Sequence, residues 1–295
     1  MEKFFPSRSA FITLIACCLV VIIALGIRQT FGLFYFDFST DLDITISQFG
    51  FAMGLQLFLW GAFSPLFGII TDKYGGNIAI FLGFLFFLTG VLLFYYGFNT
   101  GVYFIYTIGV LIGVGLGSTA IGIPVSVVAK HFPASKRTIA TGIVTCAGSF
   151  GYFVSPVLVK YSLNVTGWEN TIFYFCLLLG LGLLIALFVS TPKIPAGESQ
   201  SNNQSATEAL KEAFSNKSFI YLTLGFFVCG WHIALVATHI PTDMMDKGLP
   251  DWCATAVLSL IGLFNMVGTI TSGYLSTRYS KKKILSSIYL LRGVS

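Results

Sequence analysis

The feature that most constrains this chain is a series of long apolar runs that recur along almost its whole length. A helix needs about 20 consecutive apolar residues to cross the hydrocarbon core of a bilayer. In that core every backbone amide must find a partner within the protein, so a spanning segment is either a helix or part of a closed barrel. The runs are continuous rather than alternating, which favours helices. We therefore predict eight complete membrane-spanning helices, at 10–36, 48–71, 77–98, 101–129, 139–163, 171–191, 218–242 and 253–277.

The composition excludes a water-soluble domain. Charged residues make up 10% of the chain and hydrophobic residues 55%, whereas soluble domains carry about 25% charged residues. The six cysteines lack the paired spacing of a zinc site or a redox dithiol, and no HExxH, GxSxG or ATP-binding loop motif occurs. We expect an all-α polytopic membrane protein that is not an enzyme. It should contact the lipid bilayer and bind no metal, no cofactor and no nucleic acid.

A polar stretch divides the chain into two parts. Residues 192–216 contain two prolines, a glycine and a tract of serine, asparagine and glutamine, a composition typical of a flexible linker. This predicts a six-helix N-terminal half at 1–191, a cytoplasmic linker at 192–216 and a partial C-terminal half at 217–295. From Ala206 to Phe214 the sequence fits a short amphipathic helix on the membrane surface, and a solvated linker turn fits it equally well.

The distribution of basic residues predicts the orientation. Lysine and arginine in short loops are retained on the cytoplasmic side of a membrane. In this chain they gather at the N-terminus and in the connections that follow the second, fourth, sixth and eighth runs, whereas the remaining connections are mainly acidic. We therefore expect the N-terminus to lie in the cytoplasm.

A pattern after the second run returns after the eighth. Gly68-x-x-x-Asp72-Lys73-x-Gly75 has a weaker copy about 205 residues later, beginning at Gly273, in which a threonine replaces the acidic residue. A repeat at this distance indicates two parallel halves with the polar linker between them.

These residues carry a resemblance to the major facilitator superfamily, whose signature between its second and third helices is G-x-x-x-D-[RK]-x-G. Gly142, Gly151 and Pro156 also resemble the antiporter-type motif of that family. The resemblance covers essentially the whole chain and implies a twelve-helix transporter fold. The chain would hold about 8.5 of the twelve helices, because a ninth run from about Ile284 to Ser295 gives roughly 18 Å of helix, short of the ~30 Å hydrocarbon core.

The resemblance assigns the first motif to a conformational-switch loop, and local physical roles can be given to both motifs. We expect Gly68 to let helices approach, Asp72 to accept backbone or basic partners at a helix end, and Lys73 to stay at the lipid interface. In the second motif, Gly142 and Gly151 should admit a neighbouring helix, and Pro156 should kink the fifth span because it removes one helix hydrogen bond.

Within the superfamily the chain resembles bacterial relatives of the monocarboxylate transporters. The segments that carry this likeness are 26–32 in the first helix, 129–148 between the fourth and fifth, and 226–232 in the seventh. The likeness implies a small organic anion as substrate and a place in a bacterial inner membrane.

Arg28 is the main candidate for substrate binding. It lies about eight residues from the end of the first run, roughly 12 Å deep, where a charge costs about 2.5 to 3.5 kcal/mol. A guanidinium matches a carboxylate bidentately. We expect Arg28 to face a central cavity and contact an anionic group; a snorkelling or carbonyl-bonded arginine is the structural alternative.

Four further residues complete the predicted binding set. His232 lies in the middle of the seventh helix, near the repeat equivalent of Arg28, and an imidazole can donate to a carboxylate or carry a proton. Arg292 lies near mid-depth in the ninth run. Gln29 and Asn265 can line a cavity, although polar groups in spans equally serve to join helices.

Three functions remain open at this stage. The first is alternating-access transport of a small organic anion, with the proton as a candidate coupling ion. The second is efflux of apolar or drug-like compounds, for which a buried carboxylate would be expected. The third is a truncated fragment that does not transport.

Overall fold

The computed structural model describes residues 5–192, 206–275 and 278–294, and these ranges are helical with short connections and no strand. Seven helical segments of the described chain are long and apolar enough to cross a membrane. The longest, α8 (Ala134–Ala186), is interrupted at Gly167, whose φ of 79° and ψ of 173° end one span and begin the next. The predicted eight spans are therefore confirmed. Residues 193–205 of the expected linker and Thr277 of the second motif lie outside the described residues.

The first span consists of three consecutive helical pieces. α1 (Arg8–Thr30) begins after Ser7, whose hydroxyl oxygen accepts a hydrogen bond from the backbone amide of Ala10 at 3.0 Å. The 3-10 segment η1 (Phe31–Phe34) and α2 (Tyr35–Asp41) continue it. Much of α1 is buried, so this apolar helix lies inside the bundle.

The second span is bounded by two local signals. α3 (Ile46–Tyr74) begins with a capping box in which Thr45 and Gln48 satisfy each other's backbone amides. It ends at Gly75, whose φ of 103° is in the region that favours glycine. The third span, α4 (Gly76–Tyr95), starts at the next residue. The glycine of the family motif therefore makes the sharp reversal between the two spans.

The fourth span is broken, although the sequence predicted one helix over 101–129. It comprises α5 (Gly101–Phe104), the π-helical segment η2 (Ile105–Leu111), α6 (Ile112–Thr119) and α7 (Gly122–His131). The break lies at Ala120, which is extended with ψ of −167°. Pro124 lacks the N–H that would bond the carbonyl of Ala120 in a continuous helix, which is a physical reason for the interruption at this point.

The remaining helices follow the predicted order. α9 (Ala206–Ser215) confirms the helix rather than the turn in this region. α10 (Lys217–Asp246) and α11 (Asp251–Leu275) form the seventh and eighth spans, and α12 (Lys281–Val294) is the beginning of the ninth.

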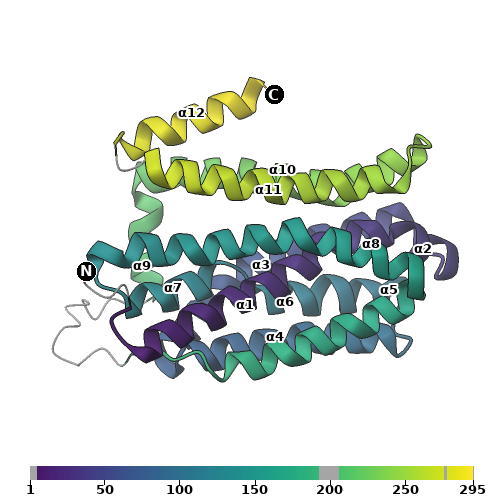
Figure 1. Cartoon of the computed structure of the whole chain (residues 1–295), viewed down its shortest axis with the longest axis horizontal. Helices are drawn as coiled ribbons and strands as arrows, with labels where there is room; N and C mark the ends of the chain where they lie inside the picture. The colour runs from purple at the N-terminus through teal and green to yellow at the C-terminus, as the bar shows by residue number, and fades with distance from the viewer. Residues whose placement is uncertain (1–4, 193–205, 276–277, 295) are drawn as a thin grey trace.

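The membrane-spanning helices run roughly along one long axis, α9 runs across it, and α11 lies along α8 (Figure 1). We call the end of the bundle that carries the turns at 42–45, 96–100 and 247–250 the distal end; it lies opposite the N-terminus (Figure 1). α1 packs closely on α8, where a Cβ added to Gly151 would lie 2.8 Å from the carbonyl oxygen of Ile22. Glycine at this position therefore brings the two backbones together, as predicted.

Candidate functional site

Arg28 is buried in α1 with 3% of its surface exposed, and it is the one charged side chain among the buried residues of the described chain. Its Nε and Nη2 atoms have no hydrogen-bond partner within the described residues. Tyr152 in α8 is also buried, with 8% of its surface exposed. A buried arginine without an anionic partner in the described chain is costly, and it offers two free donors to an acceptor that reaches it.

Gln29 and His232 come together at a small cavity between α1 and α10. The cavity has a volume of about 210 Å³. Oε1 of Gln29 and Nδ1 of His232 are buried and have no hydrogen-bond partner in the part of the chain described. The cavity is lined by Gln29, His232, Ile233, Val236, Ala237 and Ile261. Two residues of the predicted binding set, from opposite sides of the linker, therefore share one mainly apolar pocket; Arg28 precedes Gln29 in the sequence but is not among the residues that line this pocket.

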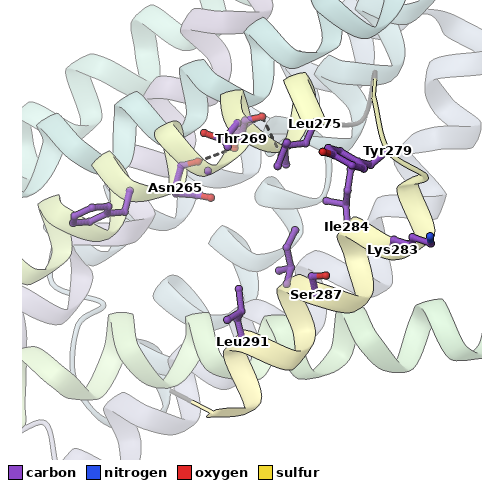
Figure 2. Close-up of a pocket in the computed structure, with 13 residues that line it drawn as sticks. Asn265, Thr269, Leu275, Tyr279, Lys283, Ile284, Ser287 and Leu291 are labelled. Atoms are coloured by element: carbon purple, nitrogen blue, oxygen red, sulfur yellow. Dashed lines mark hydrogen bonds between the residues drawn. The ribbon is translucent and has the colours of Figure 1, made fainter.

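Asn265 lies elsewhere, on a groove between α11 and α12. This groove has a volume of about 670 Å³, and Figure 2 shows Leu275 of α11 and Ile284, Ser287 and Leu291 of α12 along it, with Tyr279 from the connection between the two helices. Asn265 is exposed there, and Thr269 donates a 2.8 Å hydrogen bond to its backbone carbonyl. Arg292 lies on α12, with its side chain outside the described part. The structure therefore does not bring Asn265 to the cavity of Gln29 and His232.

The motif after the second span forms an ion pair. Nζ of Lys130, in the last turn of α7, donates to Oδ1 of Asp72 at 2.6 Å. The pair is partly solvated, since the Asp72 side chain is 70% exposed and that of Lys130 24%. Lys73 is exposed at the same helix end. Asp72 thus accepts a basic partner as expected, and the pair joins the second and fourth spans at the end opposite the distal end.

Two glycines from the family motifs do not make the close approach that the sequence predicted. A Cβ placed on Gly68 or Gly142 would meet no described atom within 4 Å. Both lie on helix surfaces that the described residues leave open, so the expectation of tight packing at these two positions is wrong for this part of the chain. Pro156 is buried inside α8. The backbone dihedral angles around it are helical, and within α8 only Gly167 departs from helical values, so the kink at Pro156 stays a prediction.

Three buried polar residues of α8 and α11 were not predicted from the sequence. Tyr152 stands between Gly151 and Pro156 in the second motif, and its burial was not expected. Thr255 and Ser259 of α11 are buried, and their hydroxyl oxygens have no partner among the described residues. A serine or threonine in an apolar run usually bonds to its own helix, so no sequence signal separates these two from the others.

The first six spans and the two that follow the linker meet at the distal end. A Cβ on Gly32 in η1 would lie 2.5 Å from the carbonyl oxygen of Ala237 in α10, and one on Gly50 would lie 3.6 Å from His239. Gly262 of α11 makes a similar backbone approach to Tyr152 and Phe153. Toward the other end, residues 217–224 of α10 are exposed. Among the described residues the two groups of spans therefore contact each other in the distal half of the bundle, and we call this arrangement the distally closed form.

No group of three metal-binding side chains occurs in the ranges that the structure covers. His239 and Asp243 are four residues apart near the end of α10 and could form at most a pair of metal ligands; Oδ2 of Asp243 accepts a 2.7 Å hydrogen bond from Nζ of Lys247. The buried polar groups of the described chain thus include the guanidinium of Arg28, the amide of Gln29, the imidazole nitrogen of His232 and the hydroxyls of Thr255 and Ser259. Long apolar helices that enclose a few such groups define a polytopic membrane protein.

The chain belongs to the Major Facilitator Superfamily, whose family model matches residues 17–295. This is a family of multi-pass membrane transporters and not of enzymes. The predicted resemblance and the all-α membrane fold are thereby confirmed.

Relatives of several kinds are similar to the chain. It is 24% identical over 290 residues to the MFS-type transporter hasB of Aspergillus fumigatus, covering 94% of this chain and 62% of the relative. It is 25% identical to a probable nitrate transporter, NarT, of Staphylococcus epidermidis, over 72% of this chain and 54% of the relative. It is 21% identical to mouse Monocarboxylate transporter 6, over 98% of this chain and 66% of the relative. The chain thus spans less than two thirds of the length of these relatives.

A solved structure supports the fold. The bacterial homologue of the human lysosomal transporter Spinster, in an inward-facing and unoccupied conformation, superposes with a TM-score of 0.66 at 17% identity. The superposition covers 94% of this chain and 64% of that one.

Proposed function

We propose that this chain carries a small organic anion, in the first place a monocarboxylate, across the membrane by alternating access, with Arg28 as the anion contact. The observation that supports this most is the burial of the Arg28 guanidinium with two unbonded donor atoms and no buried carboxylate among the described residues. A buried carboxylate partner would have explained the arginine structurally. Without one, a visiting anion is the natural partner for its charge.

The chemistry of the group favours a carboxylate. A guanidinium presents planar, paired N–H donors that match the two oxygens of a carboxylate, and such charge-assisted bonds are stronger than neutral ones. The charge cannot be removed by deprotonation in a protein. The anion would therefore be bound by a fixed positive centre and would have to be released by a change in the surroundings.

Gln29 and His232 would complete the site. Their cavity of about 210 Å³ is smaller than the 300–1,000 Å³ of most ligand pockets, which favours a small solute. His232 is the candidate group for proton coupling, because an imidazole changes charge near neutral pH more readily than any other ordinary side chain. Asn265 on α11 and Arg292 on α12 would contact the anion in another conformation of the chain.

The names of two relatives agree with an anionic substrate. One is named a nitrate transporter and another a monocarboxylate transporter. Other relatives of similar identity are named only as MFS-type transporters. We therefore place the anion proposal on Arg28 and treat efflux of apolar compounds as the outcome that a failed anion test would favour.

The proposal includes the organisation of the chain in the membrane. Residues 1–191 would form one half, 192–216 a cytoplasmic linker, and 217–295 part of the second half. The end that carries Asp72 and Lys130 has the basic connections and would face the cytoplasm under the positive-inside rule. The distal end would then face outward, and the structure would be closed to the outside of a bacterial inner membrane.

Uptake of radiolabelled monocarboxylates tests the proposal. The full-length protein is expressed in cells that lack endogenous monocarboxylate transporters. We expect Arg28→Ala to abolish uptake and Arg28→Lys to weaken it, because a lysine keeps the charge without the paired donors. Arg137→Ala, which removes an exposed arginine of α8, is the matched control. Membrane levels of each variant are measured by immunoblot.

Unchanged uptake in Arg28→Ala would contradict the assignment of Arg28. Absence of anion uptake by the unmodified protein, together with resistance of the cells to apolar toxic compounds, would favour efflux instead.

A further inference from the structure

The face of α11 that packs on α8 contains two buried hydroxyl groups for which the described residues provide no hydrogen-bond partner. Its buried residues are Ala254, Thr255, Leu258, Ser259 and Gly262, which recur at the spacing of one helix face. Thr255 is 8% exposed and Ser259 6% exposed, and neither hydroxyl oxygen has a hydrogen-bond partner within the described residues.

Other hydroxyls of the same helix behave differently. Thr269 donates to the carbonyl of Asn265, and Thr271 donates to that of Val267, each at 2.8 Å. These are the usual bonds of a serine or threonine to the preceding helical turn. Burying a hydroxyl without such a bond is unfavourable, because the group loses its water and gains no partner. Burial of Thr255 and Ser259 therefore makes the packing of α11 on α8 less stable than it would be with apolar residues at these positions.

Thr255 and Ser259 lie where the cost of burying their hydroxyls depends on whether the distal end is closed or open. Both lie in the half of α11 nearer the distal end, on the side of Gly262 that leads to the turn at 247–250. Gly262 allows the closest backbone approach of α11 to α8, at Tyr152 and Phe153. When the distal end opens, this face separates from α8 and the hydroxyls meet water.

We propose that Thr255 and Ser259 destabilise the distally closed state, so that the chain is held near a balance between its closed and open forms. The proposal rests on the alternating access proposed above. The apolar face alone would favour closure strongly, since its burial is stabilising in the same way as any helix packing. Two unbonded hydroxyls offset part of that gain only while the face is closed.

Labelling of a single cysteine tests this. Thr238→Cys is placed in a variant whose six native cysteines are replaced by alanine; Thr238 is buried at the groove between α3 and α10 at the distal end. The reaction rate of the purified protein in detergent with a water-soluble maleimide then reports how often the distal end opens. We expect Thr255→Val and Ser259→Ala each to slow labelling roughly fivefold or more.

Two further variants of α11 serve as references. Gly262→Ala should accelerate labelling, because its Cβ would collide with the backbone of Phe153 in the closed state. Thr271→Val should leave the rate unchanged, because that hydroxyl is exposed and already bonded to its own helix. A second set of proteins keeps only the native Cys17, which is fully buried in α1 and reacts with the maleimide only when the protein unfolds. The labelling rate of Cys17 should be the same with and without each α11 substitution.

Unchanged or faster labelling at position 238 in the Thr255→Val and Ser259→Ala proteins would overturn the inference, as would a Gly262→Ala protein that labels no faster than its parent. The result is independent of the substrate. If labelling shifts as expected while no anion is taken up, the substrate proposal fails and the inference about α11 stands.

Discussion

Gly32 in η1 lies directly against the backbone of Ala237 in α10, so that a Cβ on Gly32 would come within 2.5 Å of the Ala237 carbonyl oxygen. The side chain of Pro241 lies 3.2 Å from the same point. Backbone atoms of a packed helix cannot move aside as a side-chain tip can. Any residue larger than glycine therefore forces η1 and α10 apart at the distal end.

We predict that Gly32→Ala favours the distally open form. The cysteine introduced by Thr238→Cys should react faster with the maleimide, and uptake should fall although the protein still inserts into the membrane. Gly54→Ala in α3 is the control, because a Cβ there meets no described atom within 4 Å. Equal labelling rates for the two variants would show that the Gly32 contact does not limit opening.

A second prediction concerns the contact of α1 with α8. Gly151→Ala places a methyl group 2.8 Å from the carbonyl oxygen of Ile22, and overpacking of this kind costs about 1–3 kcal/mol. Gly142→Ala in the same element has open space and should be neutral or stabilising by up to about 1 kcal/mol, because alanine favours a helix. Thermal unfolding of the purified proteins in detergent should therefore move to lower temperature for Gly151→Ala and not for Gly142→Ala; a Gly151→Ala protein that unfolds at the same temperature as the Gly142→Ala protein would argue against tight packing at Gly151.

A third prediction concerns Ser190, which joins three spans at the end opposite the distal end. Its hydroxyl hydrogen-bonds to Nε2 of His131 at 3.0 Å, to Thr13 at 3.0 Å and to Ser9 at 2.6 Å. Ser190→Ala leaves these groups without their shared partner and should cost about 1–3 kcal/mol of stability.

Chemical denaturation in detergent measures the change in the Ser190→Ala protein. Ser215→Ala removes an exposed hydroxyl with one local bond to Glu212 and should cost much less. A Ser190→Ala protein as stable as this control would show that water replaces the lost bonds.

A fourth prediction is that the ion pair of Asp72 and Lys130 adds little to stability. Solvated pairs contribute about 0–1 kcal/mol and weaken with salt. A double-mutant cycle with Asp72→Asn and Lys130→Gln, measured at low and high salt, should give a coupling energy in that range that falls as salt rises. A coupling above about 2 kcal/mol, or one unaffected by salt, would assign the pair a structural role.

The number and position of the spans could be predicted because a helix that crosses a bilayer needs a long apolar run, and such runs can be read directly from the sequence. The break in the fourth span was not predicted, although Pro124 was a visible signal for it. Apolarity continues across Ala120, and a run of hydrophobic residues does not show where the backbone inside it stops being helical.

The candidate site was predictable one residue at a time but not as an arrangement. The depth of Arg28 in the membrane was predicted by counting residues along a helix, and the structure shows that its side chain is buried in the bundle. That Gln29 and His232 share a cavity and that Asn265 lies on a different groove depend on how helices rotate and pair. An apolar helix with polar residues scattered around it does not specify which face meets which neighbour.

Gly167 bears on how this protein can be engineered. The fifth and sixth spans meet through this one left-handed glycine, with helical residues on both sides and no loop between them. A tag, reporter or cleavage site added there would have to displace a turn of helix, and any other residue at 167 would strain the backbone. A tag or reporter is better inserted at a connection that already contains non-helical residues, such as the turn at 42–45.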